Sequence, residues 1–364
     1  MNLSDFDYEL PEKLIAQKPT LPRDKCRLLI LDRKTGKIQH KKFFNIVNFL
    51  QKGDVLVVNN SKVIPARLNG KKRTGGNVEI FLIKKTATDE WEALLKKFKA
   101  STFTKASTDK KALDIIISKN LIATPVKNVG EGIWKIKFNQ KGSMLDTSIR
   151  KYGQTPLPPY IKKQSKLKDY QTIYAQREGS VAAPTAGLHF TKKLFNNLKK
   201  RGVIIETITL HVGLGTFSPI REDNVEKHKM HGEWGEVSAK TAKAINKARA
   251  EDRRVIAVGT TSARTLEAFA KEVKSSKSMP TGRQVKIKRK IQIKSGKKEV
   301  DIFIKPGYDF QIVDGMITNF HLPKTTLLLL ISALAGRKKI MQSYQEAITK
   351  KYKFFSFGDA MLII

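Results

Sequence analysis

Cysteine and long apolar runs are both scarce in this chain. Its 364 residues include one cysteine, Cys26, and no uninterrupted run of about 18 apolar residues. A single cysteine excludes a disulfide framework and a cysteine-based zinc site. The missing apolar run excludes a bilayer-spanning helix, and residues 1–17 are acidic and amphipathic, unlike a signal peptide. We therefore expect a cytoplasmic protein with no membrane association.

Acidic residues are also scarce relative to basic ones. The chain has 33 aspartates and glutamates against 70 lysines and arginines, which gives a formal net charge of +37 at pH 7. Such an excess predicts affinity for a polyanion, because each neutralised phosphate releases counterions. Lysine far outnumbers arginine, however, and a lysine-rich coding bias explains the same charge. Charge alone leaves both interpretations open.

The length of the chain and its changes in pattern indicate two domains. Short β-prone runs separated by turns fill residues 63–150, which predicts a small antiparallel β-barrel. After about residue 191, strands and helices alternate, which predicts an α/β fold with a largely parallel sheet and flanking helices. We expect residues 1–62 and 151–364 to form an α/β catalytic domain and the barrel to be an insertion.

Capping residues place several helices in the α/β part. Thr191 and Ser238 precede helical patterns, Ser262 fits an N-cap of a helix through residue 273, and Gly336 ends an apolar helix. Residues 55–58 read as a buried strand. Residues 277–298 alternate apolar and basic side chains, which predicts either an RNA-binding hairpin arm or a solvated lysine-rich excursion.

Five of the six histidines occur near predicted strand ends or in loops of small residues. The sixth, His40, is expected at the surface. Imidazoles titrate near neutral pH, so proton transfer suits this group, although loop histidines also serve to satisfy backbone carbonyls. The segment around His228, His231 and Glu233 reads as one polar loop, and its spacing fits no common metal site. We expect no metal.

Two further segments suggest a small-molecule site. Residues 180–191, SVAAPTAGLHFT, are mostly small, which would let the backbone approach a flat ligand closely. Three hydroxyl residues at 260–262 follow a predicted strand and open a helix, where free N–H groups attract a carboxylate or phosphate. No G-x-G-x-x-G motif follows a first strand, so a Rossmann dinucleotide site is not supported.

Motifs along the whole chain point to one family. The chain resembles the S-adenosylmethionine:tRNA ribosyltransferase-isomerases of queuosine biosynthesis. The resemblance runs from YELPEKLIAQKP to FFSFGDAMLI, through GDVLVVNNSKVIPARL, TPLPPYI, YQTIYA, AAPTAGLHF, TLHVGLGTF, HKMHGEW, VIAVGTTSARTLE, DIFIKPGYDF and TNFHLPKTTLLLL. It implies a barrel combined with an α/β body, as the residue patterns also predict.

The resemblance also implies an activity. S-adenosylmethionine would serve as co-substrate and donate its ribosyl carbons to the aminomethyl group of 7-aminomethyl-7-deazaguanine at the wobble position of a tRNA with a GUN-type anticodon. Adenine and methionine would leave, and epoxyqueuosine-tRNA would form. The sulfonium acidifies the neighbouring C5′ hydrogens, so a base is required, and departing adenine requires an acid. A monomer is expected.

From this resemblance we assign candidate residues. The expected catalytic groups are His189, His211, His231 and His321, with Glu233 as a supporting carboxylate. The methionine or ribose end would contact Thr260, Thr261, Ser262 and Arg264, and the nucleoside pocket would be lined by Asn319, Pro184, Thr185 and Gly187. Asp359 is a lesser candidate.

The chain departs from the family pattern at two places. An Asp-Thr-Arg-like run is usual where this chain has Asn60, Ser61 and Lys62, and a histidine is usual at the position of Gln154. Two rival functions also stay open. A non-catalytic tRNA- or RNA-binding protein is compatible with the charge, and a conventional methyltransferase would require the glycine-rich first turn that is absent.

Overall fold

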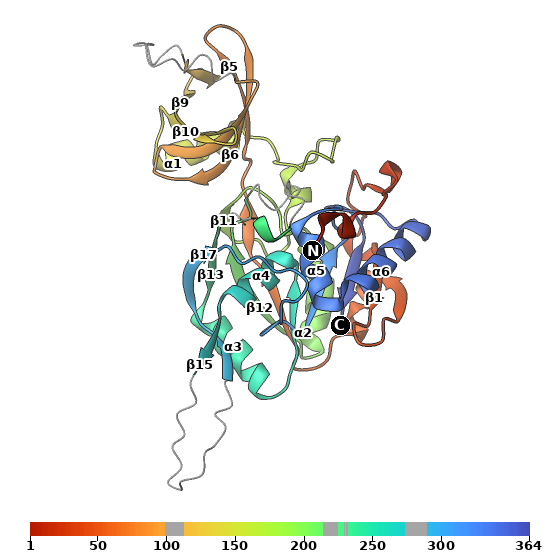
Figure 1. The fold of residues 1–364 in the computed structure, drawn as a ribbon. Coiled ribbons are helices and arrows are strands. Elements are labelled where there is room, and N and C mark those ends of the chain that lie inside the picture. Colours follow the sequence, from red (N-terminus) through yellow and green to blue (C-terminus); the bar gives the residue numbers. More distant parts are fainter. Residues whose placement is uncertain (99–112, 214–224, 229, 231, 274–289) are drawn as a thin grey trace, which may run out of the picture.

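The computed structural model describes residues 1–98, 113–213, 225–228, 230, 232–273 and 290–364. Within them, one sheet of nine strands forms the body of the molecule, and a closed barrel lies beyond one end of it (Figure 1). The strands of the sheet follow the order β17 (Gly296–Val300), β13 (Glu233–Val237), β12 (Ile204–Leu210), β3 (Val55–Asn59), β14 (Val255–Val258), β18 (Gly315–Asn319), β19 (Ala360–Ile363), β1 (Arg27–Leu31) and β2 (Ile38–Lys42).

The sheet is mixed. The neighbours β12–β3, β3–β14, β14–β18 and β19–β1 are parallel. The neighbours β17–β13, β13–β12, β18–β19 and β1–β2 are antiparallel. The expected α/β class with a separate barrel is therefore confirmed, but "largely parallel" holds only for the centre of the described sheet. Between β12 and β13 the described residues contain only the short 3₁₀ helix Val225–Lys227 and no α-helix, and an antiparallel neighbour needs no helical crossover.

Helices cover both faces of the sheet because the central strands alternate their apolar side chains. Val55 and Val57 pack in one cluster with α3, α4, α5 and α6, whereas Leu56 and Val58 pack in another with α2 and the 3₁₀ helix Phe43–Asn48. Residues 55–58 are fully buried, as predicted. The helices are α2 (Lys192–Lys200), α3 (Ala239–Ala250), α4 (Thr260–Ala268), α5 (Thr326–Ala335) and α6 (Arg337–Thr349).

Two of the expected helix starts are confirmed and one is wrong. Thr191 and Ser238 cap α2 and α3 with their side-chain oxygens. Helix α4 begins at Thr260, two residues before the expected cap, because Gly259 occupies the N-cap with a positive φ of 85°. Helix α4 also ends at Ala268 rather than near residue 273, since β15 (Ala270–Val273) pairs with β16 (Lys290–Ile293). These two strands form the base of the expected arm, and residues 277–289 lie outside the described residues.

The barrel is closed and antiparallel. Its order is β10 (Ile133–Phe138), β7 (Glu90–Lys96), β6 (Asn77–Lys85), β5 (Arg67–Lys72), β8 (Ile115–Ser118) and β9 (Leu121–Gly130). Alternate side chains, among them Leu68, Trp91 and Trp134, fill its interior. Helix α1 (Gly142–Tyr152) packs on this core through Leu145 and Ile149, although no helix was expected within residues 63–150. The division of the chain at residues 62/63 and 150/151 stays a prediction.

A short strand pair connects the N-terminal region to the small-residue segment. Strand β4 (Ser61–Val63) runs parallel to β11 (Arg177–Ser180), which directly precedes residues 181–190. This pairing brings the small-residue segment to the sheet edge. His40, which was expected at the surface, is partly buried. Its Nδ1 lies 2.7 Å from the hydroxyl of Tyr352.

The Ser238 cap yields a stability prediction. Its Oγ accepts a hydrogen bond from the backbone N–H of Thr241 over 3.1 Å. We expect Ser238→Ala to lower the free energy of unfolding by about 1 kcal/mol, because the N-H groups of the first helical turn lose a partner. Urea unfolding followed by circular dichroism measures this change. Ser238→Asn retains a capping oxygen and should restore most of the loss; equal losses in both variants would contradict the role of the cap.

Candidate active site

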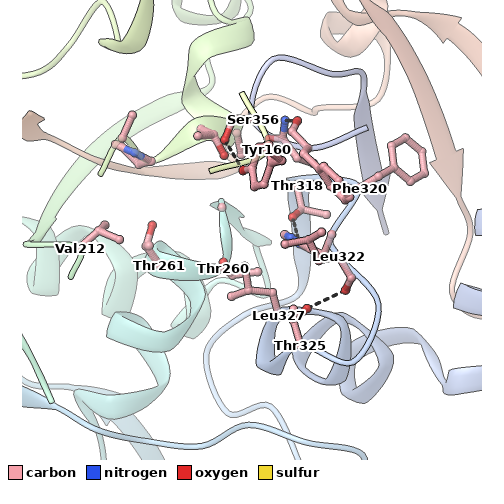
Figure 2. Close-up of a pocket in the computed structure, with 18 residues that line it drawn as sticks. Tyr160, Val212, Thr260, Thr261, Thr318, Phe320, Leu322, Thr325, Leu327 and Ser356 are labelled. Carbon is pink, nitrogen blue, oxygen red and sulfur yellow. Dashed lines mark hydrogen bonds between the residues drawn. The ribbon is translucent and has the colours of Figure 1, made fainter. Parts of the chain in front are cut away.

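A pocket opens at the edge of the sheet where the parallel strands β12, β14 and β18 end (Figure 2). Its lining comes from residues 183–186, 259–261 and 318–322, with Val212 at the end of β12. Strand β19 is antiparallel to β18, so residues 355–356, shortly before β19, reach the same edge. Ligands of open α/β sheets bind outside the carboxyl ends of the parallel strands, and this pocket occupies that position.

The pocket gathers six of the predicted site residues from three separate segments. Two belong to the small-residue segment, two to the start of α4, and two to the chain following β18. They are Pro184, Thr185, Thr260, Thr261, Asn319 and His321. Figure 2 shows Thr260 and Thr261 on one side of the pocket and Thr318 and Phe320 on the other.

The hydroxyl groups at the start of α4 differ in whether they have a hydrogen-bond partner. Ser262 Oγ donates to the carbonyl of Val258, 2.8 Å away, and Thr265 Oγ1 donates to the carbonyl of Thr261, 2.9 Å away. These two hydroxyls therefore serve the backbone. Thr261 Oγ1 is buried without a hydrogen-bond partner and lies at the pocket. It is available to a ligand, beside N–H groups at the start of a nine-residue helix.

His321 is a buried, neutral imidazole at the pocket wall. Its Nε2 lies 2.8 Å from Thr318 Oγ1, and its backbone N–H donates to the hydroxyl of Tyr344 over 2.8 Å. Burial lowers the pKa of His321 to about 3. At neutral pH the ring therefore carries no charge.

His189 lies behind the pocket rather than in its wall. Its Nδ1 forms a 3.2 Å hydrogen-bond contact with Cys26 Sγ. Burial lowers the pKa of His189 to about 4, although nearby Asn319 acts in the opposite direction. Burial raises the pKa of the Cys26 thiol, so the pair is a neutral thiol beside a neutral imidazole. His189 Nε2 and Asn319 Oδ1 are both buried without a well-aligned hydrogen-bond partner, and Asn319 Nδ2 donates to the carbonyl of Phe355 over 2.8 Å.

Glu233 and Arg264 form a buried ion pair outside the pocket lining. Arg264 Nη1 lies 2.6 Å from Glu233 Oε2, and both side chains are almost completely buried. Glu233 Oε1 also accepts the N–H of Gly213 over 2.9 Å, and Arg264 Nη2 donates to the carbonyl of Val300. The expected polar loop at Glu233 is wrong, because this residue begins β13. Through these bonds the pair connects β13 and α4 to Gly213, which follows β12, and to Val300 at the end of β17.

The remaining candidates lie apart from the pocket lining. His211 stacks on Trp234 with ring centroids 5.0 Å apart. Gly187 is required for packing, since a Cβ there would lie 1.9 Å from the hydroxyl of Tyr174. Asp359 accepts the backbone N–H groups of Arg27 and Lys353. His231 lies outside the described residues.

The departures from the family pattern have structural partners. Asn60 Oδ1 accepts the hydroxyl of Thr209 over 2.7 Å, Ser61 begins β4, and Lys62 Nζ pairs with Glu178. Gln154 donates its backbone N–H to Arg67 at the start of the barrel. None of these four residues lines the pocket.

Sequence reasoning missed several lining residues. Tyr160 and Ser356 lie side by side in the lining and are hydrogen-bonded, with 2.7 Å between Tyr160 Oη and Ser356 Oγ, and Thr318 contacts His321. Tyr160 lies in the TPLPPYI motif and Ser356 in the FFSFGDAMLI motif, so these motifs offered a signal for both. No sequence signal pointed to Thr318, because it is a threonine within the buried strand β18.

Two kinds of site are absent from the described residues. No three histidine, cysteine, aspartate or glutamate side chains among them are arranged to hold a metal ion. No helix in the described part combines the length and apolar character needed to cross a membrane.

The fold and the pocket define a mixed α/β protein with an added barrel and a ligand site at the carboxyl edge of its sheet. The model of the family described as "Queuosine biosynthesis protein" matches residues 3–363. The chain therefore belongs to the queuosine biosynthesis protein family, and the expected resemblance is confirmed.

Individual relatives extend over the whole chain. The S-adenosylmethionine:tRNA ribosyltransferase-isomerase of Fusobacterium nucleatum is 50% identical over 362 residues, covering 99% of this chain and 96% of the relative. The protein of the same name from Carboxydothermus hydrogenoformans is 48% identical, with both chains fully covered. The crystal structure of S-adenosylmethionine tRNA ribosyltransferase from Thermotoga maritima is 34% identical, covers 99% of this chain and 100% of its own, and has a TM-score of 0.52. The family is thus one of enzymes, as expected.

The two buried imidazoles predict a specific pH dependence of stability. In the folded chain, His189 and His321 have pKa values of about 4 and about 3, below the usual value of 6.5. Below pH 6.5 the unfolded chain binds protons that the folded chain does not, so stability falls as the pH decreases. Between pH 7.5 and pH 5, each histidine should cost about 2 kcal/mol.

Urea unfolding at both pH values measures this loss in the wild type and in His321→Gln. The variant should lose about 2 kcal/mol less than the wild type between the two pH values. His40→Gln is the matched control, because His40 is only partly buried. An equal pH dependence in wild type and His321→Gln would show that His321 is not held neutral.

Gly187 yields a second prediction. We expect Gly187→Ala to destabilise the fold by about 1–3 kcal/mol, because the new methyl group must displace the buried hydroxyl of Tyr174. The measured quantity is the free energy of unfolding in urea. Gly76→Ala is the control, since a Cβ there meets only Lys72 Cδ at 3.8 Å. Unchanged stability of Gly187→Ala would leave Gly187 free for a role at the ligand.

Proposed function

We propose that this enzyme transfers and isomerises the ribosyl group of S-adenosylmethionine onto 7-aminomethyl-7-deazaguanine in the wobble position of a tRNA with a GUN-type anticodon. Adenine and methionine leave, and the product is epoxyqueuosine-tRNA. The observation that carries this proposal is one pocket that combines a neutral imidazole, His321, with the start of α4 and small-residue walls, in a chain of the queuosine family.

The lining suits a nucleoside with an amino-acid tail. Ala183 and Ala186 leave room for the backbone to approach a flat base, and Asn319 brings an unpaired amide oxygen for a ring amino group. The methionine carboxylate fits the N–H groups near Thr260 and the free hydroxyl of Thr261. Arg264, predicted at the methionine or ribose end, would act indirectly by holding α4 in place through Glu233.

A neutral imidazole accounts for the proton balance. The positive sulfur acidifies the C5′ hydrogens, so a base can remove one, and adenine leaves more easily once it gains a proton. A histidine that is already protonated could not serve as that base. We assign His321 the removal of the proton and its return toward adenine, because its side chain lines the pocket in which the sulfonium nucleoside would lie. His189, His211 and His231 remain candidates for assisting groups.

The polyanionic substrate accounts for the net charge of +37. A tRNA anticodon arm needs a basic surface and a pocket that receives one extruded base. We place this reaction in the cytoplasm and on a monomer. A non-catalytic RNA-binding protein would share the charge but would have no use for unpaired buried polar atoms at a pocket.

Release of adenine tests the proposal directly. The wild-type protein is incubated with S-adenosylmethionine and a tRNA carrying the aminomethyl base, and free adenine is quantified by chromatography. We expect His321→Gln to lower the turnover rate by about 10²–10⁴-fold, because the proton-transfer group is lost. His40→Gln, remote from the pocket, should retain the wild-type rate, and thermal unfolding checks that both variants fold.

Other results would point to the rivals. Methylated tRNA with S-adenosylhomocysteine would support a methyltransferase. Binding of tRNA without adenine release by the wild type would support a binding protein. A wild-type rate in His321→Gln would remove His321 from the chemistry.

A further inference from the structure

One aromatic side chain near the pocket is exposed without an evident structural reason. Trp234 on β13 is 38% exposed, whereas the other two tryptophans, Trp91 and Trp134, are buried in the barrel core at 4% and 3%. A large exposed indole contributes little to stability, and tryptophans in such positions frequently contact a partner.

The indole is held in place on one side. The imidazole of His211 stacks on it at an interplanar angle of 18°. A Cβ on Gly179 would lie 3.1 Å from that imidazole, so the backbone of β11 closes the other side of His211. The indole remains 38% exposed beside His211, which leaves part of its surface for another flat group.

Glu299 on β17 lies directly opposite Trp234 and is 3.8 Å from Lys84, and the wider surroundings carry an excess of positive charge. On the same face of β13, Glu236 is shared by Arg177 and Lys297, at 3.8 Å and 3.9 Å. On β11, Glu178 is shared by Lys62 and Arg150, at 2.9 Å and 2.7 Å. Each group contains two cations and one anion, and the four cationic side chains are between 42% and 63% exposed. This charge suits phosphates rather than an apolar protein surface.

The position relative to the pocket is also defined. His211 directly precedes Val212, which lines the pocket. In Figure 1, β11 lies on the side of the body nearest the barrel, with β13 and β17 along the adjoining edge. A nucleic acid that delivers one base into the pocket would pass its neighbouring nucleotides over this surface.

We propose that Trp234, backed by His211, is a stacking platform for an unpaired nucleobase next to the modified base of the bound tRNA. This inference rests on the proposed function, since it takes tRNA as the substrate. Stacking on an aromatic ring tolerates any base, and the flanking cations hold the phosphates.

The three tryptophans allow a direct optical test. An unmodified tRNA transcript with a GUN anticodon is titrated into the full-length protein without S-adenosylmethionine, and tryptophan emission is recorded. We expect the tRNA to quench the emission of the wild type, because a base stacks on the exposed indole. Trp234→Phe should abolish the quenching, since Trp91 and Trp134 lie inside the barrel.

Affinity gives the second measurement. We expect Trp234→Ala to raise the Kd for the transcript by about 5- to 150-fold, which corresponds to the loss of one base–aromatic stack. Trp234→Phe should recover part of this affinity, and the KM for S-adenosylmethionine should stay unchanged. Phe44→Ala is the matched control, because Phe44 is 44% exposed on the 3₁₀ helix Phe43–Asn48.

Three outcomes would overturn the platform. The first is unchanged affinity in Trp234→Ala, and the second is undiminished quenching in Trp234→Phe. The third is an equal loss of affinity in Trp234→Ala and Trp234→Phe, together with a lowered Tm in both. The proposed function is judged separately by adenine release from the wild type. Normal adenine release with unchanged affinity in Trp234→Ala would reject the platform alone.

Discussion

The structure of the site depends on one constraint: backbone hydrogen bonding stops at the carboxyl edge of the central strands, and the freed groups need partners. Asn59 supplies them between β3 and β12, since its amide both donates to and accepts from Leu210 and also accepts the N–H of Ser61. Ser180 Oγ likewise accepts the N–H of Val212 and donates to Ala182. In the pocket lining, Thr261 Oγ1 and Asn319 Oδ1 are left buried without a well-aligned hydrogen-bond partner. Their lack of partners distinguishes them from the structural hydroxyls around them.

Electrostatics follows from the same burial. Glu233 and Arg264 neutralise each other and bind backbone groups, so they position α4 and the end of β12. Separating the two side chains would leave each charge buried and unpaired, which costs free energy. The pair therefore holds β13 and α4 together. The imidazoles of His189 and His321 stay neutral for lack of solvent. The pocket therefore brings no net charge of its own to a ligand from these groups, and proton transfer within it starts from neutral bases.

Local patterns in the sequence predicted the elements that local physics determines. The caps Thr191 and Ser238 and the buried run of β3 are encoded within a few residues. Predicted strand ends singled out the segments of Thr260, Asn319 and His321, and the family resemblance assigned all three to the site. Strands β13 and β15 were missed, because each is short and partly polar. The ion pair of Glu233 with Arg264 was equally invisible, since only the fold brings β13 against α4. Tyr160 was missed for the same reason, because only the fold brings it beside Ser356, which precedes β19.

The end of β12 shows how one strand can serve two substrates. Consecutive residues of an extended chain point to opposite sides. Val212 lines the pocket that we assign to the nucleoside, whereas His211 supports Trp234 on the cationic surface that we assign to the RNA. The backbone of this segment is fixed from both directions, because Val212 donates to Ser180 and His211 donates its N–H to the carbonyl of Trp234 over 3.0 Å. A ligand on either side therefore meets a rigid wall. A fixed separation between the two sides would hold the acceptor base at a constant distance from the sugar, which is what a transfer between two large substrates requires.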